Sequence, residues 1–195
     1  KHVLTNAFVM VDGVKRQIIE IKIPTSSGNR SMWELKRDMT ISELPIGARI
    51  KNKGSSYYGK DLVYIKLEDD HYGNNETTLL IEQIICLKAI DAKEPSNSNS
   101  KRKSYGNNRY IHSNLRQWLN SSASNWYSVQ HSADAPPTSS GVSYNAYDKE
   151  KGFMANLTPE LRSAILPTSL KVTKNPVDGG GLESFTDKIF LLSCT

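Results

Sequence analysis

The feature that most constrains the fold of this chain is a short amphipathic helix predicted at residues 113–120. Ser113 can cap this helix, because its hydroxyl can accept hydrogen bonds from the free N–H groups of the first turn. Leu115, Trp118 and Leu119 then fall at i, i+3 and i+4, so one face carries a large apolar anchor. A helix this short is marginal alone, and we therefore expect the anchor to dock on a β-sheet. The polar side chains expected on the solvent side are Asn114, Arg116, Gln117 and Asn120.

Most of the remaining chain reads as short strands and turns. Apolar and polar residues alternate over residues 61–67, which predicts a half-buried strand. A polar turn at 68–76 separates it from a second strand at 77–85, and the apolar residues at 188–192 predict a closing strand. These short elements favour small sheets over a helical bundle.

Two long loops and a second helix complete the expected domain. The loops, residues 91–108 and 121–151, are longer than a compact domain normally tolerates without a purpose. The second helix is expected after Thr158, a suitable cap, with Pro159 at its first position. The sequence therefore predicts an α+β domain whose recognition surface is built from loops on a fixed scaffold.

A β-hairpin arm is predicted at the N-terminus. Asp12-Gly13 lies between the β-prone runs 7–11 and 17–23, a strong hairpin signal because the tight turn needs positive φ. Residues 24–29 read as a linker. An isolated hairpin is barely stable in water, so the arm either pairs back on the domain or lends an edge to another protein chain. The residues expected to mediate assembly are Val9, Val11, Ile19 and Ile21.

Composition limits the chain to one modest domain, residues 31–195, after the arm and linker at residues 1–30. Hydrophobic residues make up 37% of the chain, and no apolar run approaches the ~20 residues needed to cross a bilayer. The net charge is +5, but the charges are scattered, and only Lys101-Arg102-Lys103 is dense. This trio follows a polar stretch at 96–100, so we expect a solvated loop rather than a nucleic-acid site.

Patterns that carry catalysis or metal binding are missing from the sequence. Two Cys and four His show no zinc-ligand spacing, and Cys86 is expected to be a small buried hydrophobe. The turn at 68–76 reads as an ordinary polar turn rather than a calcium site. His131 with Asp134 resembles part of a triad, but no nucleophile is specified, and we expect a hydrogen bond that ties the loop. We therefore expect no catalytic residue, metal or cofactor.

Aromatic residues in the two long loops are the strongest sign of recognition. Tyr and Trp offer large, rigid, amphipathic contact area at low entropic cost, which suits glycan or protein ligands. The candidate ligand-binding residues are Tyr105, Asn107, Trp126, Tyr127, Tyr144 and Tyr147. The residues expected to form the structural core are Leu115, Trp118, Leu119, Phe153 and Phe190.

Three segments resemble a known family: Tyr105–Asn120, Gly152-Phe153-Met154-Ala155 and Asp187–Ser193. The chain resembles, from Ile41 to Thr195, an uncharacterised domain family found in phage, prophage and surface proteins of Gram-positive bacteria. This family is similar to C-type-lectin-like domains of the formylglycine-generating-enzyme type, with a Trp-bearing helix packed on a small sheet under long loops. The resemblance implies a scaffold and no active site.

The resemblance and the aromatic loops lead to one functional expectation. We expect a structural protein of a phage or phage-tail-like particle, attached to other particle proteins through the arm and present in several copies. Its domain would bind a glycan or protein of the host surface without catalysis and without nucleic acid or membrane insertion. A purely structural virion component, such as a capsid decoration or baseplate brace, is the runner-up, and a cell-wall-acting enzyme is a distant third.

Overall fold

The computed structural model describes residues 8–11, 14–17, 20–26, 28–34, 40–73 and 75–192. The chain divides into two units, Lys1–Leu44 and Pro45–Thr195. Each unit has its own secondary structure and is described by itself.

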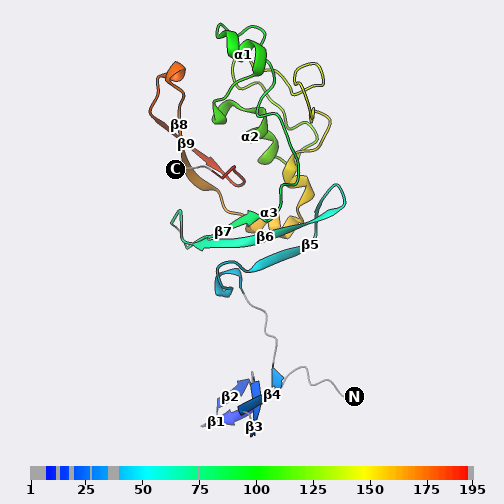
Figure 1. Ribbon diagram of the computed structural model, residues 1–195, viewed down its shortest axis with the longest axis vertical. Helices are drawn as coiled ribbons and strands as arrows, with labels where there is room; N and C mark the ends of the chain where they lie inside the picture. The colour runs from blue at the N-terminus through cyan, green and yellow to red at the C-terminus, as the bar shows by residue number, and fades with distance from the viewer. Residues whose placement is uncertain are drawn as a thin grey trace. The chain divides into compact units, whose positions relative to one another are not determined.

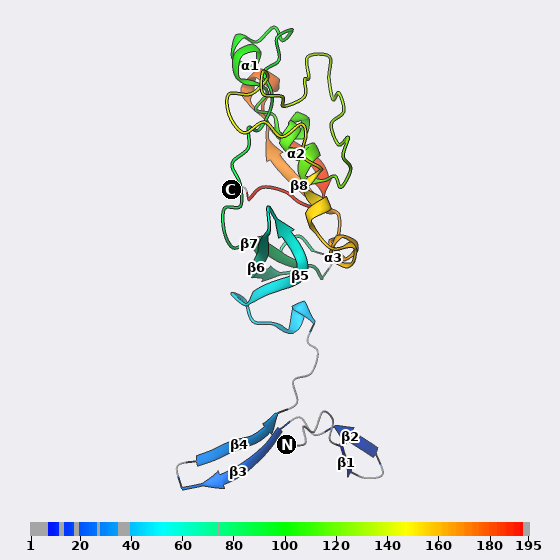
Figure 2. The same ribbon diagram turned by 90° about the vertical axis from the view of Figure 1, so that its right-hand side faces the viewer.

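Unit 1 contains two antiparallel hairpins where the sequence predicted one (Figure 2). β1 (Phe8–Val11) pairs with β2 (Val14–Gln17), and β3 (Glu20–Thr25) pairs with β4 (Gly28–Glu34). The expected second strand at 17–23 is therefore wrong. Unit 1 ends with the 3-10 helix η1 (Ile41–Glu43).

The expected linker at 24–29 also proves wrong, because Thr25 pairs with Gly28 at the end of the second hairpin. β4 runs across the boundary expected after residue 30, and unit 1 ends in the sequence at Leu44, directly before Pro45 of unit 2. Of the expected assembly residues, Val9 and Val11 lie in β1 and Ile21 lies in β3. Ile19 and the Asp12-Gly13 turn lie outside the described residues.

Unit 2 is built on a three-stranded antiparallel sheet in the order β5-β6-β7. Its strands are β5 (Arg49–Tyr57), β6 (Lys60–Asp69) and β7 (Thr77–Ile81). The strand predicted at 61–67 lies within β6, and its burial alternates, but Lys66 falls on the buried face with Leu62 and Tyr64. The polar turn joins β6 to β7. β7 ends four residues before the predicted limit at residue 85. Half-buried Cys86 therefore lies beyond the strand rather than inside it.

In its described residues, unit 2 also contains three short α-helices and three 3-10 helices. Their bounds are α1 (Ser100–Tyr105), α2 (Asn114–Leu119), α3 (Pro159–Ala164), η2 (Tyr110–His112), η3 (Phe153–Asn156) and η4 (Pro176–Asp178). The sheet lies at one end of unit 2 and α1 at the other, with α2 between them (Figure 1).

The two predicted helices begin where their caps were expected. The Ser113 hydroxyl accepts from the Arg116 N–H at 3.2 Å, and the Thr158 hydroxyl accepts from the Leu161 N–H at 3.3 Å. α1 was not expected, because its sequence read as a solvated loop. The Asn99 side chain caps it by accepting from the N–H groups of Lys101 and Arg102.

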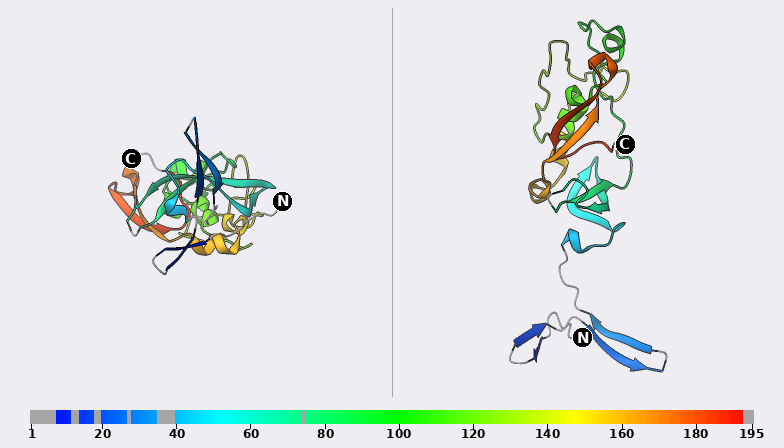
Figure 3. Two further views of the ribbon diagram at one scale, coloured as in Figure 1. Left: turned by 90° about the horizontal axis from the view of Figure 1, so that it is seen from below. Right: turned by 90° about the vertical axis from the view of Figure 1, so that its left-hand side faces the viewer.

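The closing element of unit 2 is an antiparallel hairpin of β8 (Thr168–Thr173) and β9 (Leu182–Asp187), which lies beside α2 (Figure 3). The strand predicted at 188–192 is wrong. At the start of this segment the Asn120 side chain takes the place of a strand partner: it accepts from the N–H groups of Lys188 and Ile189 and donates to the Ile189 carbonyl. Residues 188–192 therefore have the apolar sequence of a strand but pair with no described strand.

The core of unit 2 forms around Trp118, as predicted. Its side chain is 1% exposed. Its ring centroid lies 5.3 Å from that of Phe153, 5.7 Å from that of Tyr147 and 6.1 Å from that of Tyr57 on β5. The indole N–H donates to the Lys151 carbonyl at 3.0 Å, so burial leaves no polar atom of this ring unsatisfied. The buried cluster comprises Tyr57, Leu62, Tyr64, Leu115, Trp118, Leu119, Trp126, Tyr147, Phe153 and Leu157.

Two residues near the core lie elsewhere than predicted. Phe190 is half-buried outside the cluster, where its ring packs edge-on against Tyr72 at 5.5 Å. Asn114 was expected to face solvent but is fully buried. Its side-chain carbonyl accepts from the Ala92 N–H at 2.9 Å, and its amide donates to Asp134. Asn114 is therefore covered by residues of both long loops, whereas Arg116, Gln117 and Asn120 are half-buried.

The glycine of the Gly-Phe-Met-Ala segment is required by a close approach of two backbones. A Cβ at Gly152 would lie 2.2 Å from the carbonyl oxygen of Ser121. The Gly152 N–H also donates to the Ala123 carbonyl, and the Met154 N–H donates to the Ser121 carbonyl. Glycine at this position lets the end of the long loop lie directly against its beginning.

Replacing Trp118 by alanine tests the central role of this side chain. We expect Trp118→Ala to lower the free energy of unfolding by about 3–5 kcal/mol, since it leaves a cavity and an unpaired Lys151 carbonyl. Urea unfolding followed by circular dichroism measures the loss. Tyr144→Ala, which removes an exposed ring, should change stability by less than about 0.5 kcal/mol. Equal, small losses for the two variants would contradict this account of the core.

Candidate ligand-binding groove

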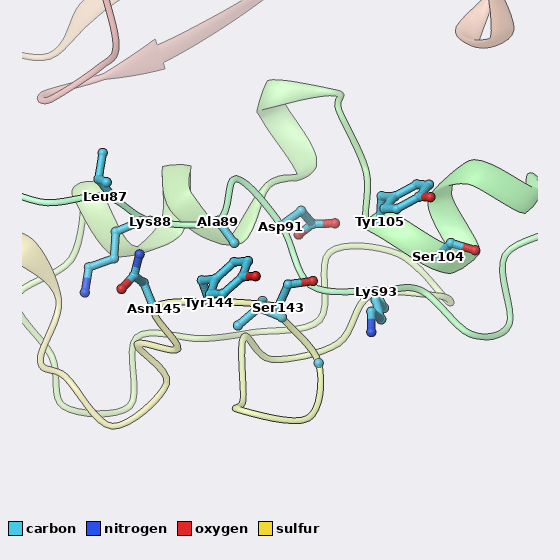
Figure 4. Close-up of a pocket in the computed structure, with 12 residues that line it drawn as sticks. Leu87, Lys88, Ala89, Asp91, Lys93, Ser104, Tyr105, Ser143, Tyr144 and Asn145 are labelled. Carbon is cyan, nitrogen blue, oxygen red and sulfur yellow. The ribbon is translucent and has the colours of Figure 1, made fainter.

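A groove of about 270 Å³ opens on unit 2 between three segments of the chain (Figure 4). Residues 87–93 contribute its floor. Ser104 and Tyr105, at the end of α1, form one wall, and residues 141–145 form the other. Lys88 and Asn145 lie at one end of the groove, and Lys93 and Tyr105 lie toward the other. Both predicted long loops therefore contribute to one site.

Two of the predicted ligand-binding residues lie together at this groove. The side chains of Tyr105 and Tyr144 are each 81% exposed. Ser143 and Asn145 flank Tyr144, are also exposed, and make no hydrogen bond to any residue that the structure describes. The groove thus presents two aromatic faces together with polar atoms that are free to bind a ligand.

The other four candidates do not line the groove. Trp126 and Tyr147 are 6% and 1% exposed, and their rings stack with centroids 5.5 Å apart. Asn107 is 5% exposed, and its side-chain carbonyl accepts from the Arg109 N–H. Tyr127 is half-buried against the core. The prediction that Trp126, Tyr147 and Asn107 contact a ligand is wrong, because these side chains hold the loops in place.

Hydrogen bonds fix the wall that carries Tyr144. The Tyr147 hydroxyl donates to the Ala89 carbonyl at 2.8 Å, which ties the wall to the groove floor. The Lys93 N–H donates to the Gly141 carbonyl at 2.9 Å, which makes a second connection. The Trp126 indole N–H donates to the Glu150 carbonyl at 2.9 Å. The loop is therefore ordered by its contacts although it contains no regular secondary structure.

The wall that carries Tyr105 is fixed by Arg102. Its guanidinium makes two hydrogen bonds to Asp178 of η4, at 2.9 and 2.5 Å, and these hold the pKa of that carboxyl below its usual range. The end of α1 needs glycine, because Gly106 has a φ of +88° and a Cβ there would lie 2.6 Å from the Ala92 carbonyl oxygen. α1 is therefore held by the Arg102 side chain and by the close backbone contact at its C-terminal end.

Arg102 is the first of three arginines that connect this part of the chain to the closing hairpin. They recur at intervals of seven residues, and each binds a carboxylate of the segment 178–187. The pairs are Arg102 with Asp178, Arg109 with Glu183 and Arg116 with Asp187. The carboxylate side chains are at most 10% exposed, so these are not solvent-exposed surface pairs. They fix the position of residues 102–116 relative to residues 178–187.

Two acids of the segment that follows Ile90 are buried: Asp91, which lines the groove, and Glu94. Asp91 accepts from the backbone N–H groups of Asn107 at 2.7 Å and Asn114 at 3.1 Å. Burial nevertheless raises the pKa of Asp91 to about 7. Glu94 is fully buried, and one of its carboxylate oxygens lies 2.8 Å from Nε2 of His131. No group of acids, histidines and cysteines among the described residues is arranged to hold a metal ion.

His131 and Asp134 tie the second loop, as predicted. Asp134 accepts from the Gln130 N–H at 2.8 Å and from the Asn114 side chain, and Nδ1 of His131 accepts from the Ala133 N–H. Within the described part of the chain, neither residue hydrogen-bonds a serine hydroxyl or a cysteine thiol.

The residues that join the two loops carry no clear signal in the sequence. Asp91 and Lys93 lie on the groove floor, and no local pattern distinguishes them from solvated loop residues. A signal for α1 was present, because Asn99 is a favourable N-cap residue. The dense basic trio is split by α1: Arg102 turns inward to Asp178, while Lys101 and Lys103 remain exposed.

These elements define unit 2 as an α+β domain of small antiparallel sheets, few short helices and long ordered loops. The chain belongs to the DUF6273 family, described as a domain of unknown function, whose profile matches residues 75–195. The matched part contains all residues that line the groove, whereas β5 and β6 precede it. No curated protein and no solved structure matches the chain. No helix within the described residues is long and apolar enough to span a bilayer.

The raised pKa of Asp91 predicts a pH-dependent stability. The folded state holds the Asp91 proton more tightly than the unfolded chain, so this contribution is complete below pH ~4 and is lost as pH rises through about 7. We expect the free energy of unfolding to fall between pH 4.5 and 8, by on the order of 1 kcal/mol or more from this group. Urea unfolding at a series of pH values measures it.

Asp91→Asn separates this effect from other titrations, such as that of His112, whose pKa burial lowers. The variant places an amide NH2 where one carboxyl oxygen of Asp91 accepts a backbone N–H, so it loses one of these two hydrogen bonds and is less stable. Its loss of stability between pH 4.5 and 8 should nevertheless be smaller than that of the natural chain. An unchanged difference between the two pH values would contradict the assignment to Asp91.

Proposed function

We propose that this protein is a non-enzymatic recognition domain that binds a surface glycan in the groove between Tyr105 and Tyr144. The observation that carries the proposal is the exposure of both rings, 81% each, on a groove whose walls are fixed to a packed core. Exposed aromatic rings held in place offer apolar faces on which sugar rings stack at low entropic cost.

The polar part of the groove supports a saccharide ligand. Ser143 and Asn145 present a hydroxyl and an amide that make no hydrogen bond to a described residue. A sugar ring carries hydroxyl groups around an apolar face, so it pairs with such atoms while it stacks on a tyrosine. Binding sites of this kind combine apolar lining with a few placed polar groups on loops that a rigid scaffold supports.

The finer fold class and the biological setting belong to the same proposal. A Trp-bearing helix on a small sheet, under long ordered loops, supports a C-type-lectin-like arrangement. The sequence resemblance to phage and Gram-positive surface domains supports a place on a virion or a similar particle, where the groove would face the host cell. A purely structural particle component remains the alternative, and it predicts that the groove binds no glycan.

Alanine substitutions of the two tyrosines test glycan binding. We expect Tyr105→Ala and Tyr144→Ala each to weaken binding to host cell-wall glycans about tenfold or more, the loss typical of an aromatic anchor. Binding of the purified full chain to a glycan array and to intact cells measures the effect. Tyr58→Ala is the matched control, because Tyr58 is 76% exposed on the β5–β6 turn, outside the groove. Equal binding by all three variants would refute a role for the groove.

We further propose that unit 1 attaches the domain to its particle. β1–β2 and β3–β4 are two-stranded sheets with no third described strand, and such hairpins are barely stable in water. Their open edges suit pairing with strands of neighbouring chains, including further copies of this one.

Removal of unit 1 tests this attachment. We expect the full chain to self-associate, whereas a chain that starts at Pro45 sediments as a monomer and retains glycan binding. Analytical ultracentrifugation at several concentrations distinguishes the two. The same sedimentation behaviour for both chains would remove the assembly role.

A further inference from the structure

The charged side chains at the groove differ in whether they are already paired. Lys88 forms an ion pair with Glu150, its side chain is 8% exposed, and its ammonium lies 5.4 Å from the Trp118 ring centroid. Asp91 is 5% exposed, and both its carboxylate oxygens accept backbone N–H groups. These two side chains are therefore committed to the protein itself.

Lys93 differs from both, because it forms no ion pair with any described residue. Its backbone is fixed between the two walls: its N–H donates to the Gly141 carbonyl, and the next N–H, of Glu94, donates to the Arg102 carbonyl of α1. Figure 4 shows its side chain beside Ser143, on the side of the groove where Tyr105 lies, with the ammonium directed away from the Tyr105 ring. A cation without an internal counter-charge thus lies at one end of the groove.

A second unpaired cation lies on the wall of α1. Lys101 precedes Ser104 and Tyr105 by three and four residues, so the three share one helical face. Lys101 is exposed and forms no ion pair within the described part of the chain. Among the residues that line the groove, Asp91 is the one acid, and its side chain is buried and accepts two backbone N–H groups.

We propose that the ligand of this groove is an acidic glycan, whose phosphate or carboxylate group is bound by Lys93 with support from Lys101 while its sugar rings stack on the tyrosines. This inference rests on the proposed glycan-binding function. An unpaired lysine that lines the groove can bind an anionic substituent by a charge-assisted hydrogen bond, whereas a neutral sugar leaves that charge unpaired. The groove therefore distinguishes acidic glycans from neutral ones of the same backbone.

The test compares immobilised glycans that share a backbone and differ in charge: neutral, uronate-containing and phosphate-containing members, together with a single-stranded DNA oligonucleotide. With the full chain we expect binding to at least one acidic member to exceed binding to its neutral parent about tenfold, and to weaken as salt rises from 50 to 500 mM. The uronate and phosphate arms identify which anion is bound.

Variants assign the preference to residues. Lys93→Gln should lower acidic binding about tenfold, a larger loss than for the neutral parent. Lys93→Arg should retain the preference for the acidic glycan, and Lys101→Gln should lower that preference less than Lys93→Gln does. Lys60→Gln replaces an exposed lysine at the start of β6, so it matches the charge change away from the groove and should have no effect.

The outcomes separate this inference from the function on which it rests. Tyrosine-dependent binding that is equal for acidic and neutral glycans, or unaffected by Lys93→Gln, overturns the acidic ligand and leaves glycan recognition standing. Absence of tyrosine-dependent binding to any glycan overturns both. Tighter, Lys93-dependent binding of the oligonucleotide than of every acidic glycan overturns the inference in favour of a nucleic-acid ligand.

Discussion

The burial of the Trp118 indole is the interaction on which the structure of unit 2 depends. Its ring packs against Tyr57 of the sheet and against Phe153 and Tyr147, which belong to the chain on either side of the long loop's end. Its N–H satisfies the Lys151 carbonyl. One side chain thus links a sheet of local hairpins to loops that have almost no secondary structure of their own. Without it, the loops would have to order themselves against a large entropic cost.

Ion pairs and hydrogen bonds of buried carboxylates position the segments around the aromatic core. The three arginines at seven-residue intervals bind the closing hairpin, and Asp91 joins the start of α2 to the loop above it. Ion pairs and buried carboxylates of this kind add little net stability but penalise every alternative arrangement, since a displaced partner would be left charged and unpaired. These polar contacts fix the positions of the groove walls, whereas the aromatic core provides most of the stability of the domain.

The sequence predicted the features that depend on local interactions. The caps at Ser113 and Thr158 and the alternation within β6 are local, and the core position of Trp118 follows from its spacing with two leucines. The features that were missed depend on contacts between distant residues. Asn120 hydrogen-bonds the backbone of Lys188 and Ile189 where a strand partner was expected, and Asn114 is buried because loop residues cover it. Trp126 and Tyr147 looked like surface aromatics, since nothing local shows which of several loop aromatics turns inward.

This sorting of aromatic residues has a consequence for how such a domain can diversify. The side chains of Tyr147 and Trp126 anchor the loop, whereas those of Ser143, Tyr144 and Asn145 form no hydrogen bond with any residue that the structure describes. Substitutions at these tip positions would alter the chemistry offered to a ligand with little effect on folding. Evolution could therefore retarget the groove one residue at a time, much as antibodies exchange the tips of their variable loops on a constant framework.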